Sequence, residues 1–494
     1  MPPTKTTSIG DLPMEVLEDI VLRAMSEGPH RWAPLLATVH PTWQMIVERR
    51  VFNTLVLRDT DAMGAVMETL RRYTWRFEAV EVIRVPLILP SFPAVECTAI
   101  ENSETRFQND LAFSRGLGSL LRHLAEWPAT PKGLELRLFI FSPSDVVYHN
   151  QWHIMVRHQH GIVEGDIGHM RTFESTLEWL NLGSSIEVPN VTKFGLVHGC
   201  QRYISAKTME RLHQTFTGLK FVDLNLWDIY KIVPLSRIHP APHLKRRTSR
   251  RAMVRALAQL PSSLDQMHLH IEYLPPANQS FPAERTIDAQ GNPDELTSAW
   301  RRATQKLSIV RTTGMLWTPE LFWPRQTTAA EPQPFWPRLK QLSVLYHIVD
   351  PAGDWVFEAD QDPPIRSQLV RPRYPIPPAY GHSPEDAQPN QFRFTAIQEK
   401  MDKFYATIAK AVTHMPKLES LHAQAITFWG LDMVPFHAFW LAIDNNKRTA
   451  EAIWIGSPRY EPSHAVLSKW RAMAYTRDLA LEFKWDPFPP HSWH

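Results

Sequence analysis

One apolar spacing returns along the chain and constrains its fold more than any other feature. The stretch LKFVDLNL follows an L-x-x-L-x-L-x-L pattern, and its last part alternates apolar and polar residues. That alternation is typical of a strand with one buried face. The clearest copies begin at Leu219, Leu264, Leu339 and Leu418, and looser ones include VTKFGL and FEAVEVIRV.

Helical patterns precede these strands. In residues 395–415 the apolar residues Ile397, Met401 and Phe404 recur on one helical face, and Pro416 ends the pattern just before a strand. Similar patterns precede the copies at Leu219 and Leu264. A helix–strand unit that recurs along a chain is typical of repeat folds.

The spacing between units is irregular. Only the gap between Val191 and Leu219 fits the roughly 20–29 residues of a leucine-rich repeat. The longer gaps require insertions or repeats that the pattern does not reveal. Two proline-rich stretches, at about 275–300 and 359–393, are predicted to be inserted loops. A mixed α/β domain without a regular repeat is the alternative interpretation.

The N-terminal segment 12–52 has a different character. In LPMEVLEDIVL, Pro13 suits the first turn of a helix, and Val16, Leu17 and Ile20 follow at helical spacing. Two further short apolar patterns follow, up to Phe52. A segment of about 40 residues seldom folds stably by itself. We therefore expect it to leave apolar surface for a partner to cover.

These residues resemble an F-box. The resemblance rests on Leu12-Pro13-x-Glu15-Val16-Leu17-x-x-Ile20, on Leu36-Ala37-x-Val39, and on Trp43 with Val51-Phe52. That family is a three-helix module that docks on the Skp-type adaptor of SCF ubiquitin ligases. The stretch VHPTW departs from the family at Pro41, where many members have a Cys followed by a basic residue.

The resemblance implies roles for named residues. It assigns the adaptor contact to Leu12, Pro13, Val16, Leu17 and Ile20, and the module's own core to Leu36, Val39, Trp43 and Phe52. It also implies that the chain is the substrate-recognition subunit of an SCF-type ligase, with a Skp-type adaptor, a cullin and an unidentified target protein as partners. An F-box-like interaction scaffold outside ubiquitination is the main alternative, and an enzyme with a scattered site is the second.

The remainder resembles the degenerate leucine-rich repeats that often follow an F-box, particularly in large filamentous-fungal families. The expected fold is therefore α+β or α/β, with a three-helix F-box in residues 1–58. An irregular leucine-rich-repeat-like solenoid of helix–strand units, carrying Pro-rich loops, is expected in residues 59–494.

Composition excludes several classes of protein. The balance of 53 Lys+Arg against 51 Asp+Glu is too neutral for a chain that binds nucleic acid or membrane surfaces as a whole. Two cysteines, Cys97 and Cys200, argue against a disulfide framework and fit a reducing compartment. Without a signal peptide or a long apolar run, the expected location is the cytoplasm, the nucleus or both.

Catalytic motifs are absent from the sequence. It contains no G-x-S-x-G, P-loop, G-x-G-x-x-G or H-E-x-x-H motif. We therefore expect no enzyme activity, cofactor or metal site. Two local features stand apart. His149, His153, His158 and His160 are interpreted as surface histidines rather than metal ligands. The basic run 245–251 is interpreted as a solvated helix start, with a nuclear-import signal, a nucleic-acid patch or a kinase site as alternatives.

Overall fold

The computed structural model describes residues 12–27, 32–93, 96, 101–144, 176–180, 186–196, 202–228, 242–272, 279–280, 283, 285–287, 293–328, 331–359, 393–426, 437–456 and 460–486. The two cysteines, the histidine-rich run 149–160 and residues 360–392 of the second predicted loop lie outside the described residues.

Helices occur from the first described residues to the C-terminal region. They are α1 (Met14–Glu27), α2 (Trp32–Ala37), α3 (Pro41–Phe52), α4 (Ala62–Arg71), α5 (Thr74–Ala79), α6 (Ser103–Ala125), α9 (Ala206–Thr215), α10 (Pro242–Ala258), α11 (Glu295–Thr304), η4 (Pro319–Leu321, a 3₁₀ turn), α12 (Gln398–Val412) and α13 (His464–Thr476).

Most strands belong to one large sheet. In their order across it they are β1 (Thr54–Val56), β2 (Val82–Ile88), β3 (Leu134–Phe141), β5 (Val191–Leu196), β7 (Phe221–Trp227), β8 (Gln266–Glu272), β9 (Ile309–Leu316), β10 (Gln341–His347), β13 (Ser420–Ile426), β14 (His437–Asp444), β15 (Thr449–Gly456) and β16 (Ala480–Asp486). Two small pairs accompany it, β4 (Thr176–Leu177) with β6 (Tyr203–Ile204), and β11 (Phe357–Ala359) with β12 (Arg393–Ala396).

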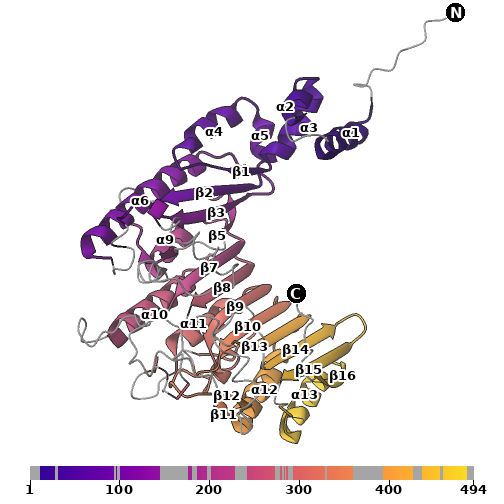
Figure 1. Ribbon diagram of the computed structural model, residues 1–494. Helices are drawn as coiled ribbons and strands as arrows, with labels where there is room; N and C mark the ends of the chain where they lie inside the picture. The colour runs from indigo at the N-terminus through magenta and orange to yellow at the C-terminus, as the bar shows by residue number, and fades with distance from the viewer. Residues whose placement is uncertain are drawn as a thin grey trace, which may run out of the picture.

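The large sheet follows the order of the chain. Its strands are parallel from β1 to β13, β14 runs antiparallel to both β13 and β15, and β16 is again parallel to β15. In Figure 1 the strands stand side by side from indigo to yellow, and helices α4 to α13 run along one side of the curved sheet. The expected α/β class is confirmed, and the structure adds that the large sheet is mostly parallel.

Equivalent residues lie at equivalent places in successive units. The leucine that precedes a strand is fully buried in five units, at Leu219, Leu264, Leu307, Leu339 and Leu418. The residue after it donates its backbone N–H to its counterpart in the preceding unit, over 2.8–2.9 Å, from Asp265 through Ser308 and Lys340 to Glu419. Each buried leucine contributes roughly 1.5–3 kcal/mol to folding, so this layer binds neighbouring units together.

The unit that begins at Leu307 does not match the L-x-x-L-x-L-x-L pattern of the other units. Thr312 stands where the other units have an apolar residue, and it is 1% exposed. Its hydroxyl accepts a hydrogen bond of 2.9 Å from the indole N–H of Trp300 in α11. A buried hydroxyl that makes a hydrogen bond is tolerated in a core. Thr312 can therefore occupy a buried position at which the sequence pattern expects an apolar residue.

The buried apolar side chains of the described residues form two separate clusters. A small one joins α1, α2 and α3, and a large one fills the space between the sheet and its helices. Strand β1 lies inside the segment 1–58 but pairs with β2, so the sheet begins before the border expected from the sequence. The loop predicted at about 275–300 is also too long, because α11 begins at Glu295 with Asp294 as its N-cap.

Candidate functional site

The first three helices form a module with a core of its own. This N-terminal helical module (α1–α3) buries Leu17, Val21, Trp43, Ile46 and Val47 against one another. His40 caps α3, and Pro41 occupies the first turn, where its missing N–H costs nothing. Pro41 therefore starts the third helix.

The residues assigned to adaptor contact divide into three groups. Pro13 and Val16 are exposed, with 43% of Val16 accessible. Leu12 and Ile20 are partly buried and pack against the module's core. Leu17 is only 2% exposed. Its assignment to a contact surface is corrected, because its side chain already completes the core of the module.

The residues assigned to the module's core also divide. Trp43 is buried, and Leu36 packs partly buried against the same cluster. Val39 is 58% exposed, because α2 ends at Ala37 and the chain turns before α3. Phe52 packs against the large cluster rather than the small one. The core assignments of Val39 and Phe52 are therefore corrected.

The module exposes large apolar side chains. Met14 and Val16 on α1, Trp32 and Leu35 on α2, and Val39 after it have between 42% and 65% of their area accessible. Trp32 and Leu35 lie three residues apart on one face of α2. This spacing is the signal in the sequence for Trp32, which the F-box resemblance does not include. These exposed apolar side chains are the candidate interaction site of the module.

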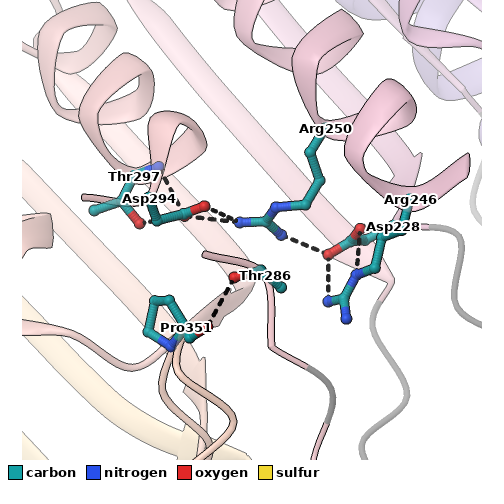
Figure 2. A network of polar contacts seen from close by, with 7 residues as sticks. All are labelled: Asp228, Arg246, Arg250, Thr286, Asp294, Thr297 and Pro351. Carbon is teal, nitrogen blue, oxygen red and sulfur yellow. Dashed lines mark hydrogen bonds and ion pairs between the residues drawn. The ribbon is translucent and has the colours of Figure 1, made fainter. Parts of the chain in front are cut away.

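A second arrangement, shown in Figure 2, is built on the basic run. Arg246 and Arg250 lie one turn apart on α10 and are only 2% and 7% exposed. Arg246 donates from Nε and Nη2 to the carboxylate of Asp228, over 3.1 and 2.9 Å. Arg250 donates to Asp228 over 2.6 Å and to both oxygens of Asp294 over 2.8 and 2.7 Å.

This network shifts the pKa values of its members. Burial alone would raise the pKa of Asp228, but the Arg246 and Arg250 guanidinium groups lower it to about 2. Burial alone would lower the pKa of Arg250, and the Asp294 and Asp228 carboxylates raise it instead. The interpretation of 245–251 as a solvated helix start is wrong for Arg246 and Arg250, which join β7, α10 and α11.

A hollow of about 230 Å³ adjoins the network, lined by residues that include Arg247, Arg251 and Glu295. The Asp294 carboxylate at this hollow accepts hydrogen bonds from Arg250 and from Thr297 at the start of α11. Nearby, the Thr286 hydroxyl donates to the Pro351 carbonyl over 3.3 Å. The hydrogen bonds to Arg250 and Thr297 give the Asp294 carboxylate a structural role.

The described residues show no gathered metal ligands and no helix suited to crossing a membrane. Among the described residues, no three His, Cys, Asp or Glu side chains gather as metal ligands would. None of the helices that the structure describes combines the length and apolar character needed to cross a membrane. The histidine-rich run lies outside these ranges, so its interpretation stays a prediction.

The chain matches no model of a known protein family, and a search of curated proteins finds no match either. The proposed function therefore rests on the residues and the fold.

Proposed function

We propose that this chain is the substrate-recognition subunit of an SCF-type ubiquitin ligase. The observation that carries the proposal is the exposed apolar surface of the N-terminal helical module. Leu35 is 65% and Val16 43% accessible, although the module has completed a core of its own. A Skp-type adaptor would cover this surface, as the F-box resemblance implies.

The rest of the chain would hold the target. Sheet strands that follow chain order, each new unit stacked on the last, support a leucine-rich-repeat-like solenoid. Such stacks present an extended surface on which a partner can lie. The chain itself would do no bond chemistry, since holding a target lysine near a recruited conjugating enzyme is catalysis by proximity.

Co-purification tests the proposal. The tagged full-length chain should capture a Skp-type adaptor together with a cullin, and both should be lost from the double variant Leu12→Ala with Pro13→Ala. Capture of the adaptor without a cullin would support the scaffold alternative and reject the ligase. Capture of neither would reject the F-box assignment. Localisation in the cytoplasm, the nucleus or both stays a prediction.

A further inference from the structure

The sheet face opposite the helices carries a row of residues whose neighbours are fixed by the strand register. On each strand, alternate residues are buried toward the helices, and the others point to the opposite, open face. One row of Cα partners crosses this open face from β7 to β14: Asp223, His268, Arg311, Ser343, His422 and Trp440.

Arg311 is the exposed cation of this row. Its side chain is accessible, and it forms no ion pair with another described residue. Its partners on the adjacent strands, His268 and Ser343, are not acidic. The nearest acidic member of the row is Asp223, and its carboxylate accepts a hydrogen bond from Arg137 over 2.9 Å. The positive charge of Arg311 therefore has no carboxylate beside it in the row.

An aromatic platform lies at the β14 end of the same row. Trp440 is 37% exposed, and its ring lies 4.4 Å from that of His422. His422 in turn approaches the Ser343 hydroxyl, with 3.4 Å between Nδ1 and Oγ. On β15 the partner of Trp440 is Ile453. A cation and an exposed apolar platform thus share one line across the sheet.

We propose that this row binds an extended segment of the target protein, with a carboxylate on Arg311 and an apolar side chain on Trp440. The inference rests on the proposed function, since it names what the recognition domain would recognise. One planar guanidinium matches one carboxylate through two parallel hydrogen bonds. Phosphorylated segments are recognised by clusters of arginines, and a nucleic-acid backbone requires several cations. Neither fits Arg311, whose neighbours in the row, His268 and Ser343, are not arginine or lysine.

The register also predicts a spacing. Arg311 and Trp440 lie three strands apart, on β9 and β14, which corresponds to about 14 Å at the usual distance between strands. An extended chain rises about 3.3 Å per residue, so the acidic and apolar residues should lie about four positions apart. Residues four apart also point to the same side of an extended chain.

Selection from a library of random unphosphorylated peptides against the full-length chain tests the inference. The selected peptides should carry Asp or Glu about four residues from an apolar, preferably aromatic, residue. Their affinity should fall by about tenfold or more in Arg311→Glu and in Trp440→Ala. Arg84→Glu is the matched control, because Arg84 is an exposed arginine on β2, outside the row from β7 to β14. It should change affinity by less than about twofold.

A selection that returns no binders, or binders without acidic residues, would overturn the inference. Equal affinity of the selected peptides for the wild type and for Arg311→Glu would overturn it as well. Adaptor capture, measured on the same preparations, should be identical in wild type and Arg311→Glu. A chain that fails to capture the adaptor but selects acidic peptides would reject the ligase proposal and leave the peptide surface standing.

Discussion

Arg76 on α5 donates two hydrogen bonds to the Glu48 carboxylate on α3, from Nε to Oε2 over 2.7 Å and from Nη2 to Oε1 over 2.6 Å. Both side chains are largely buried, at 7% and 14% exposure. Arg76 also donates to the Thr69 carbonyl over 2.8 Å. The pair joins α3 of the N-terminal helical module to α5, and the Thr69 contact extends the link to α4.

Breaking this pair should be costly. Glu48→Gln leaves the buried Arg76 charge without its carboxylate, and we expect the free energy of unfolding to fall by about 3 kcal/mol. Glu126→Gln is the matched control, because its pair with Arg71 is 58% and 54% exposed. It should cost less than about 1 kcal/mol. Equal losses in chemical denaturation would contradict the role given to the Arg76–Glu48 pair.

The buried network predicts a dependence on pH. The pKa of Asp228 is lowered from 3.8 to about 2. Its contribution to the free energy of unfolding is therefore complete above pH 3.8 and is lost as the pH falls through about 2. Asp228→Asn should lower the free energy of unfolding by about 3 kcal/mol or more at neutral pH. The difference from wild type should shrink between these two pH values.

Denaturation of both proteins across that range checks this prediction. Asp478→Asn is the control, because Asp478 and its partner Arg448 are 79% and 70% exposed; it should cost less than about 1 kcal/mol. A constant difference between Asp228→Asn and wild type over the whole range would refute the network's electrostatic role.

Asp110 on α6 should behave in the opposite way. Burial raises its pKa from 3.8 to about 6, so ionising it costs the folded state stability, and that cost grows as the pH rises between these values. The carboxylate accepts the Glu178 N–H over 2.8 Å, and an asparagine oxygen can do the same. Asp110→Asn should therefore stabilise the protein by about 1 kcal/mol at neutral pH. No gain at pH 3 is expected, and a gain of equal size there would count against this explanation.

Two glycines should respond differently to alanine. Gly314 on β9 has φ of +88°, and a Cβ there would lie 1.8 Å from the Ile271 carbonyl oxygen. Gly314→Ala should cost about 3 kcal/mol or more. Gly118 lies within α6 with nothing inside 4 Å of an added Cβ, so Gly118→Ala should gain about 0.5–1 kcal/mol. Thermal unfolding of the two variants should shift in opposite directions; shifts of the same sign would contradict this description of the backbone.

The sequence predicts what depends on local spacing. Strands at Leu219 and Leu264 follow from the alternation of apolar residues, and the pattern fails at Leu307 because Thr312 is satisfied by a tryptophan on another element. The partners of the basic run are likewise distant in the sequence. The Asp294 that neutralises Arg250 lies 44 residues further along the chain, and no local pattern reports such a partner.

The exposure of the residues assigned to adaptor contact follows from the sequence only in part. Val16 and Pro13 are exposed as expected, but helical spacing alone does not separate Leu17 from Val16. Which of two adjacent residues faces the core depends on how α1 packs against α3, a tertiary contact that the pattern does not contain. Val39 is exposed because the short α2 ends two residues before it, and the spacing of apolar residues does not show where that helix ends.

The affinity of the full-length chain for a purified Skp-type adaptor tests the central claim most directly. Val16→Asp combined with Leu35→Asp places charges on the exposed apolar surface and should weaken binding by at least about 100-fold, with an unchanged melting temperature. Tyr475→Asp, at an 89% exposed position on α13, should bind as wild type does. Absence of wild-type binding, or equal affinity in the double variant, would contradict the account.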